Sequence, residues 1–194
     1  METIQQQKAA LRRRLAAREQ AMTQRERELS DRAIIYHVTR TEEYRRARTV
    51  FAFVGCGREI GTRALLERIL SEGKELCVPL CTGPGRMECR RVQDLSVLRP
   101  GSYGIPEPPA GAPEVPPQRL ALCVLPCLAA APDGTRLGYG GGYYDRFLPL
   151  ACNAVKIALC RAVLLEPVLP RECHDVRADF VLTEDALYAC KGGG

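Results

Sequence analysis

The sequence lacks the features that mark several common protein classes. No apolar run approaches the roughly 18–20 residues that a membrane-spanning helix needs. The first eight residues, METIQQQK, contain neither the apolar core nor the cleavage pattern of a signal peptide. The motif G-x-x-x-x-G-K-[ST] of a Walker nucleotide loop is also missing. These absences predict a cytoplasmic protein that has no membrane partner.

A C-x-x-C pair is missing too, although the chain contains ten cysteines. They are scattered along the sequence, and the chain is too long for a small scaffold held by disulfides. We interpret Cys77, Cys123 and Cys160 as small buried hydrophobic residues inside predicted strands. A zinc site built from the pairs Cys77/Cys81 and Cys123/Cys127 is the alternative, but their spacing falls at strand ends and not on zinc knuckles.

The composition favours one globular domain over residues 1–194, because 46% of the residues are hydrophobic. The net charge of +5 is uneven: residues 1–48 hold twelve Lys or Arg and seven Asp or Glu, whereas the rest holds sixteen of each. Such a basic first quarter suits a small ligand that carries phosphate. RNA binding is the alternative, but no platform of aromatic and basic residues accompanies the charge. We therefore expect no nucleic-acid partner.

Two helices are predicted at the N-terminus. The first runs from Ile4 to about Ala21, where Ile4, Leu11, Leu15 and Arg18 recur near helical spacing without an intervening Gly or Pro. Thr23, with a glutamate three residues later, forms a capping box that begins the second helix. We expect the pair to form a helical hairpin packed on the main body.

The rest of the chain alternates strands and helices. The apolar run Thr49–Val54 is typical of a buried parallel strand. Thr62 is a candidate cap for a helix closed by Gly73, and Pro79 is expected to end the strand that follows. Further strands are expected at 87–92, 120–125, 155–160 and 180–183. The pattern predicts a three-layer α/β/α sandwich with a mostly parallel sheet, in which ligands bind at the C-terminal ends of the strands.

Residues 99–118 differ from this pattern because they contain seven of the fourteen prolines. A long loop without regular structure inside a compact domain is often functional. Tyr103 lies within it and offers a ring on which a ligand can stack. The alternative is a surface excursion with Tyr103 packed down as an anchor.

The most distinctive stretch is the glycine loop, residues 138–142, where four of five residues are glycine. A strand is predicted before it and a helix through Leu150 after it, an arrangement that gathers backbone N–H groups around an anion. Arg136 and Arg146 flank the loop, and Asp145 offers the hard oxygen ligands that Mg²⁺ prefers. Phosphate with magnesium is the favoured interpretation. The alternative is a structural turn in which Asp145 answers the helix dipole.

These residues also resemble a known family. The stretch LGYGGGYYDRFL at residues 137–148 is similar to the signature of the 5-formyltetrahydrofolate cyclo-ligase family, also called 5,10-methenyltetrahydrofolate synthetases. Weaker matches follow the family's order along nearly the whole chain: Lys8-x-x-Leu11-Arg12, Arg58-Glu59-Ile60-x-Thr62, Tyr103-Gly-Ile-Pro-Glu-Pro108, His174-Asp175 and Thr183-Glu184.

The resemblance implies an ATP-dependent ring closure of 5-formyltetrahydrofolate to 5,10-methenyltetrahydrofolate, with Mg²⁺ and with release of ADP and phosphate. In the implied mechanism the γ-phosphate activates the formyl oxygen, N10 attacks the activated carbon, and phosphate departs. Phosphoryl transfer depends on charge neutralisation and alignment, which explains why no nucleophile with a paired base stands out. His174 is expected to be a structural residue, since this reaction asks for no imidazole.

The same resemblance assigns roles to particular residues. ATP would be bound by Lys8, Arg12, Arg136, Leu137, Gly138, Tyr139, Gly140, Gly141, Gly142, Tyr143 and Tyr144. The folate would be bound by Val54, Glu59, Tyr103, Tyr139 and Tyr143, and the metal by Asp145 and Asp175. Arg136, Tyr143 and Asp145 would be the catalytic residues. The Glu59 carboxylate suits the two-donor edge of a pterin. The alternative is that Glu59 caps the helix that begins near Thr62.

This chain departs from some members of the family at two places. Gly141 stands where some members carry a lysine, and Tyr103 where some carry a tryptophan. Backbone N–H groups can replace the missing phosphate contact. The absent lysine also motivates an alternative function, a non-catalytic folate or nucleotide binder with the same fold. We expect the protein to act as a monomer on small-molecule substrates.

Overall fold

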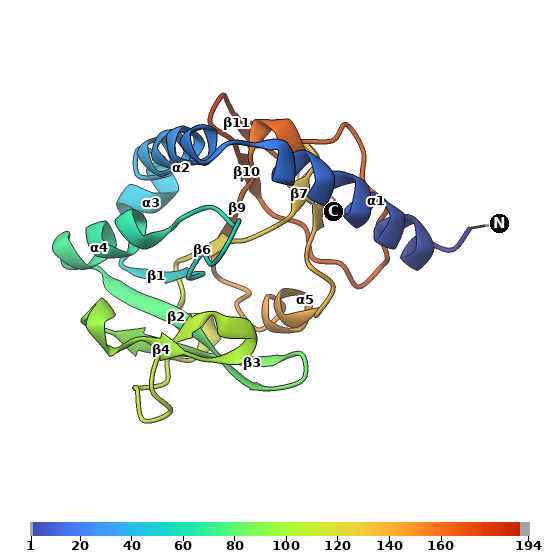
Figure 1. The fold of residues 1–194 in the computed structure, drawn as a ribbon. Coiled ribbons are helices and arrows are strands. Elements are labelled where there is room, and N and C mark those ends of the chain that lie inside the picture. The colour runs from blue at the N-terminus through green and yellow to red at the C-terminus, as the bar shows by residue number, and fades with distance from the viewer. Residues whose placement is uncertain (1, 191–194) are drawn as a thin grey trace.

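Seven strands form the central sheet of the computed structural model, which describes residues 2–190 (Figure 1). Their order across the sheet is β11-β10-β9-β6-β1-β2-β3. The parallel strands are β1 (Thr49–Ala52), β2 (Glu75–Gly83), β6 (Leu122–Leu125), β9 (Val155–Leu159) and β10 (Phe180–Leu182). The antiparallel edge strands are β3 (Arg86–Val92) and β11 (Leu187–Ala189). The predicted mostly parallel sheet is confirmed.

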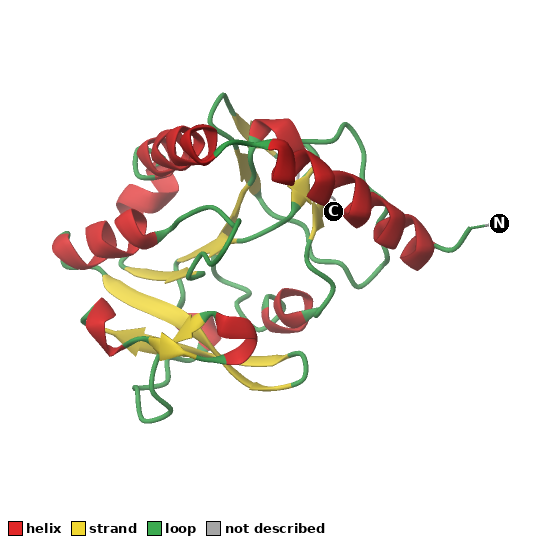
Figure 2. Ribbon diagram, in the orientation of Figure 1, coloured by secondary structure: helices red, strands yellow, loops and turns green. Residues whose placement is uncertain are grey.

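Helices cover both faces of this sheet (Figure 2). On one face lie α1 (Ile4–Ala21) and the short α5 (Tyr143–Phe147), and on the other lie α2 (Gln24–Val38), α3 (Glu42–Arg46) and α4 (Arg63–Ser71). The three-layer α/β/α prediction and the N-terminal helical region are therefore confirmed. The expected helical hairpin is wrong, because α1 and α2 lie on opposite faces of the sheet. Each packs on the body separately, α1 against the turn Ala162–Leu164 and α2 against β10.

Capping decides where the first two helices begin. Thr3 and Gln6 form a capping box for α1, and Thr23 and Glu26 form the predicted one for α2. Each box satisfies backbone N–H groups that the helix itself cannot. Within residues 2–190, no helix combines the length and the apolar character that a membrane crossing requires.

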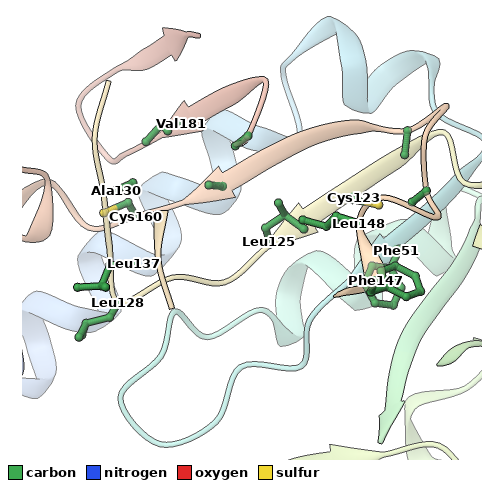
Figure 3. Close-up of a cluster of buried hydrophobic side chains, with 14 of the residues drawn as sticks. Phe51, Cys123, Leu125, Leu128, Ala130, Leu137, Phe147, Leu148, Cys160 and Val181 are labelled. Carbon is green, nitrogen blue, oxygen red and sulfur yellow. The ribbon is translucent and has the colours of Figure 1, made fainter. Parts of the chain in front are cut away.

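The core beneath α1 and α5 is continuous with the sheet (Figure 3). Phe51 of β1 packs against Phe147 of α5 with ring centroids 4.8 Å apart. Cys77, Cys123 and Cys160 are buried and all ten cysteines are free, as the interpretation of small hydrophobic residues predicted. Among the described residues, the cysteines do not gather as a metal-binding group. The geometry of the described residues therefore gives the zinc alternative no support.

Two expectations near the sheet are also wrong. Pro79 does not end β2, which continues to Gly83. Since β1 pairs with β2 only as far as Cys77, Pro79 has a strand neighbour on one side alone, where its missing N–H is tolerated. Thr62 does not cap α4 with its side chain. Its hydroxyl instead donates to the carbonyl of Phe53 at 2.8 Å and accepts from the N–H of Gly55 at 2.9 Å, which closes the loop after β1.

Several short elements were not predicted. Residues 95–119 contain the 3-10 turns Leu95–Val97, Ser102–Gly104 and Pro117–Arg119 and the small hairpin of β4 (Arg99–Pro100) with β5 (Pro106–Glu107). A second hairpin, β7 (Ala129–Ala130) with β8 (Arg136–Leu137), leads into the glycine loop. The strand β11 follows the one expected to be last, and α5 ends at Phe147 and not at Leu150. Two-residue strands carry too little periodicity to be recognised.

The order of the strands creates a crevice between β1 and β6. These neighbouring strands are parallel, and the chain turns to β2 on one side but to β9 and β10 on the other. The loops that leave their C-terminal ends therefore diverge, which is where open α/β sheets bind ligands. The loop after β1 carries Glu59, and the segment after β6 carries the glycine loop.

Candidate active site

A cleft of about 660 Å³ opens at this crevice. It is lined by α1, by the loop after β1, by residues 103–107, by the glycine loop and by residues 172–175. In Figure 1 the orange-to-red segment after β9 runs beside the blue helix α1, so residues 172–175 meet Lys8 of the first helix at the cleft. All the predicted site residues line it: Lys8, Arg12, Val54, Glu59, Tyr103, Arg136, Leu137, Gly138, Tyr139, Gly140, Gly141, Gly142, Tyr143, Tyr144, Asp145 and Asp175.

The helix α1 presents one face to the interior, and that face differs from the expected one. Its buried residues are Lys8, Leu15 and Glu19, whereas Ile4 and Arg18 are exposed. Positions seven and eleven residues apart return to the same side of a helix. Lys8 and Glu19 therefore lie about 16 Å apart along one face, at 1.5 Å per residue. A cation and a carboxylate thus mark two ends of the cleft.

At the Lys8 end, the ammonium group contacts two carboxylates. Its Nζ lies 2.5 Å from Oδ2 of Asp175 and 2.9 Å from Oε2 of Glu172. Burial alone would lower the pKa of Lys8, but these hydrogen bonds raise it above its ordinary value of 10.5. Burial would also raise the pKa of Asp175, yet the contact with Lys8 holds it below 3.8. Both groups are therefore charged at neutral pH.

A second ion pair lies beside the first. Nη2 of the buried Arg136 is 2.6 Å from Oδ1 of Asp145, and the N–H of Val176 donates to the same oxygen at 3.1 Å. Because Val176 follows Asp175, the two carboxylates predicted to bind metal are brought to adjacent segments. The Nε of Arg136 is buried without a hydrogen-bond partner among the described residues, so this donor is unsatisfied in the ligand-free protein.

The glycine loop presents unused donors. Gly140 and Gly142 have φ angles of 103° and 65°, a region that favours glycine. No N–H group from residue 138 to residue 145 donates to an acceptor within the described part of the chain. Successive free N–H groups at the start of a helix form a concave site for an anion. The loop can therefore hold phosphate with its backbone alone.

At the other end of the cleft, two carboxylates have no ion-pair partner among the described residues. Neither Glu19 nor Glu59 forms an ion pair with any residue in the range 2–190. Burial raises the pKa of Glu59 above 4.5 against a hydrogen bond from the N–H of Cys56, and the charge of Glu19 adds to the rise. Burial likewise raises the pKa of Glu19, with partial relief from the charge of Arg161. Glu59 does not cap α4.

Glu19 is a site residue that the sequence analysis missed. Its signal was available, because it lies eleven residues after Lys8 on an uninterrupted helix. Arg161 was also missed: its side chain is only 2% exposed and forms an ion pair with Asp31 at 2.7 Å. Its Nη2 lies 3.4 Å from the carbonyl oxygens of Arg58 and Glu59. Arg161 thus stabilises the loop that carries Glu59 through contacts with its backbone.

Tyr103 and Tyr143 meet at the cleft. Their rings pack edge to face with centroids 6.2 Å apart, and their hydroxyl oxygens are 3.3 Å apart. Tyr103 is 78% exposed and has a φ angle of 58°, which is unfavourable for a residue with a side chain. The alternative in which Tyr103 is packed down as an anchor is therefore wrong. Its ring is available to a ligand.

His174 is exposed beside the Lys8 end. Its Nε2 lies 3.7 Å from Glu172 and 3.9 Å from Asp175. Ligand atoms of these three residues lie within 4.8 Å of one another, which makes them a candidate group for a cation. The group includes one of the predicted metal ligands, Asp175.

Comparison with known proteins places these residues in a family context. The family model described as the 5-formyltetrahydrofolate cyclo-ligase family matches residues 4–184. A 5-formyltetrahydrofolate cyclo-ligase from Mycolicibacterium smegmatis is 35% identical over 145 residues, which cover 70% of this chain and 73% of the relative. A protein of the same name from Mus musculus is 27% identical over 198 residues, covering 95% and 97%.

Solved structures give the same result for the fold. The NMR structure of 5,10-methenyltetrahydrofolate synthetase from Aquifex aeolicus is similar with a TM-score of 0.83 and 27% identity, covering 96% of this chain and 94% of that chain. A 5,10-methenyltetrahydrofolate synthetase from Mycoplasma pneumoniae gives a TM-score of 0.74 at 18% identity, covering 91% and 98%. At that lower identity, the likeness shows a shared fold only.

Proposed function

The chain belongs to the 5-formyltetrahydrofolate cyclo-ligase family, and from this premise we propose that it converts 5-formyltetrahydrofolate to 5,10-methenyltetrahydrofolate with ATP, releasing ADP and phosphate. The observation that carries the proposal is that a phosphate-binding loop and two buried carboxylates line the same cleft. The free N–H groups of the glycine loop suit phosphate, and the unpaired carboxylates suit a ring edge rich in N–H donors.

ATP takes the Lys8 end in this proposal. Its phosphates lie against the glycine loop and the N-terminus of α5, where the helix dipole favours negative charge. Lys8, Arg12 and Arg136 bring three cations to the same wall of the cleft. Arg12 already donates from Nε to the carbonyl of Gly138 at 2.8 Å. Its remaining donors can therefore reach a phosphate without the loop having to move.

Mg²⁺ fits beside the phosphates. Asp145 and Asp175 offer hard oxygen ligands on segments that are joined through the N–H of Val176. Protein sites for this ion commonly use one or two carboxylates together with phosphate oxygens. The bound ion would neutralise phosphate charge. In its absence Arg136 and Lys8 contact these two carboxylates and hold them in place.

The folate takes the Glu59 end. The 2-amino group and the neighbouring ring N–H of the bicycle form a two-donor edge, and a buried carboxylate accepts both. Val54 contributes an apolar wall, and Tyr103, Tyr139 and Tyr143 contribute rings that can stack on the pterin or the aminobenzoyl group. This places the formyl group between the two ends.

The chemistry then needs alignment more than covalent help from the protein. The formyl oxygen takes the γ-phosphoryl group and ADP leaves. N10 attacks the activated carbon, its proton is released, and the C–O bond breaks as phosphate departs. Arg136 neutralises charge on the transferring group and Tyr143 orients it, and Asp145 keeps Arg136 in position through their ion pair.

Product formation tests the proposal directly. Purified protein with ATP, Mg²⁺ and 5-formyltetrahydrofolate should produce the conjugated methenyl product, which absorbs in the near ultraviolet, with one ADP per product. Omitting ATP is the matched control and should give no product. Binding of both ligands by calorimetry without turnover would instead support the alternative, a non-catalytic folate or nucleotide binder.

The proposal also includes the location of the enzyme and its oligomeric state. A metabolic enzyme of this kind would act in the cytoplasm, and a cleft whose described lining comes entirely from one chain supports a monomer. Sedimentation of the purified protein should give a mass near 21.4 kDa. A stable mass twice as large would contradict the monomer.

A further inference from the structure

Arg146 lies outside the cleft and fastens the glycine loop to another part of the sheet. Its Nη2 donates to the carbonyl of Gly141 at 2.5 Å, and its Nε donates to the carbonyl of Gly85 at 2.8 Å. Gly85 lies 61 positions earlier, in the turn between β2 and β3. The described residues that line the cleft include Gly141 and Gly142 but not Arg146.

This contact orients one peptide group. The described residues contain no cis peptide bond, so the carbonyl of Gly141 and the N–H of Gly142 point in opposite directions. Arg146 holds the carbonyl on the outer side of the loop. The N–H of Gly142 therefore points away from Arg146, and Gly142 itself lines the cleft.

Both glycines at this contact leave room for the guanidinium. A Cβ atom at Gly85 would lie 1.7 Å from Nη2 of Arg146, and a Cβ atom at Gly142 would lie 3.0 Å from its Nη1. The φ angles of both glycines are 65°. The turn between β2 and β3 and the glycine loop are thus shaped around the same side chain.

We propose that Arg146 is a positioning residue, which presets the Gly141–Gly142 peptide to donate to a phosphate and brings a positive charge beside a loop that has glycine at position 141. The inference rests on the proposed nucleotide site. It does not require that Arg146 touch the phosphate, since its two hydrogen bonds go to carbonyl oxygens.

Two variants remove this contact in different ways. Arg146→Ala deletes the guanidinium, and Gly85→Ala displaces it without changing the charge of the protein. Each should raise the KM for ATP and the Kd for ADP about tenfold, as expected for losing hydrogen bonds to a charged donor. The KM for 5-formyltetrahydrofolate should stay the same. In the Arg146→Ala background, Gly85→Ala should cause little further loss, because the two changes act on one contact.

The control is Arg63→Ala, which removes an exposed arginine that pairs with Glu67 on α4. It should leave all three constants unchanged. An ADP affinity of Arg146→Ala within about twofold of the wild type would overturn the inference, as would additive effects of the two variants. A merely structural role would lower the melting temperature and leave the ADP affinity of the folded protein intact.

Calorimetry with ADP separates this inference from the proposed function. Weaker ADP binding by both variants, together with a wild-type protein that forms no methenyl product, would leave the positioning role standing and refute the ligase activity. Methenyl product formed by the wild type, together with unchanged ADP binding by both variants, would support the ligase activity and refute the positioning role. A wild-type protein that binds no ADP would overturn the inference.

Discussion

The two ends of the cleft treat carboxylates in opposite ways. At the Lys8 end, Asp145 and Asp175 each lie within 2.6 Å of a buried cation. At the Glu19 end, Glu19 and Glu59 are buried without an ion pair to a described residue, and burial raises the pKa of both. The two carboxylates of the first end are paired before any ligand arrives. The second has acceptors whose partners must come from a ligand.

The difference has opposite consequences for stability. The pKa of Asp175 is lowered in the folded state, so its contribution to stability is present above 3.8 and is lost as the pH falls through the folded pKa. The pKa values of Glu19 and Glu59 are raised. Their burial costs least below pH 4.5, where both carboxyl groups are protonated. The free energy of unfolding then falls as the pH rises through their folded pKa values. Substitutions that change one of these side chains at a time test the difference between the two ends.

Asp145→Asn should have the largest effect. It removes the charge that orients Arg136 and that would bind Mg²⁺, and losing one such group costs roughly 10²–10³ in kcat. Folate binding should change little. Turnover and the folate Kd would be compared with those of Asp185→Asn, which alters an exposed carboxylate near β11. Turnover within about threefold of the wild type at limiting Mg²⁺ would refute the metal role.

Glu59→Gln should act on the other substrate. The change replaces a carboxylate oxygen, which accepts a hydrogen bond from the ring, with an amide N–H that faces another donor. The KM for 5-formyltetrahydrofolate should therefore rise about 10- to 100-fold, while the KM for ATP is unchanged. Glu67→Gln on the exposed face of α4 is the matched control. An unaltered folate KM would count against the assignment of Glu59.

Glu19→Gln should stabilise the ligand-free protein. Removing a buried charge should add on the order of 0.5–1 kcal/mol to the free energy of unfolding at neutral pH, because Arg161 offsets only part of the cost. The gain should be smaller near pH 5 than near pH 7.5, as measured by urea unfolding. Asp175→Asn should show the opposite sign at both values. A loss of stability in Glu19→Gln would mean that the attraction of its carboxylate to the charge of Arg161 outweighs the cost of burial.

Tyr103→Ala should have the smallest effect on activity. Its ring contacts Tyr143 but is largely exposed, so the folate KM should rise only about two- to tenfold. Tyr103→Gly should lose the same contact yet be about 1 kcal/mol more stable than Tyr103→Ala, because the φ angle at this position is 58°. Equal stabilities of the two variants would show that the backbone at Tyr103 stores no strain.

Much of the fold was readable from local patterns. The bounds of α1 and the capping box of α2 matched the structure, as did the positions of the parallel strands within a few residues. The errors have a common cause. Pro79 and Thr62 were interpreted from their usual local roles, but the strand pairing of β2 and the loop after β1 gave each a different one. Neighbours that are distant in the sequence overrode the local preference.

The residues proposed from the sequence come together in one cleft, but the contacts among the cleft residues were not predicted. Every predicted residue lines the cleft, whereas Glu19, Arg161 and the contact between Arg146 and Gly85 were not foreseen. Glu19 carries the periodicity of a buried position, yet a glutamate on a helix rich in charge reads as a solvated residue. Nothing in the sequence near Arg146 points to a glycine in the turn between β2 and β3.

The sequence by itself determined the features that depend on one residue and its immediate neighbours. These include the capping boxes, the apolar strands, and the glycine positions where a positive φ angle leaves N–H groups free. Only the tertiary structure decided which charges meet. Lys8 and Asp175 are 167 positions apart, and Glu19 has no such partner among the described residues. Whether a buried carboxylate has an ion-pair partner depends on which residues the fold brings within contact distance. Those residues are far away in the sequence, so local patterns do not predict them.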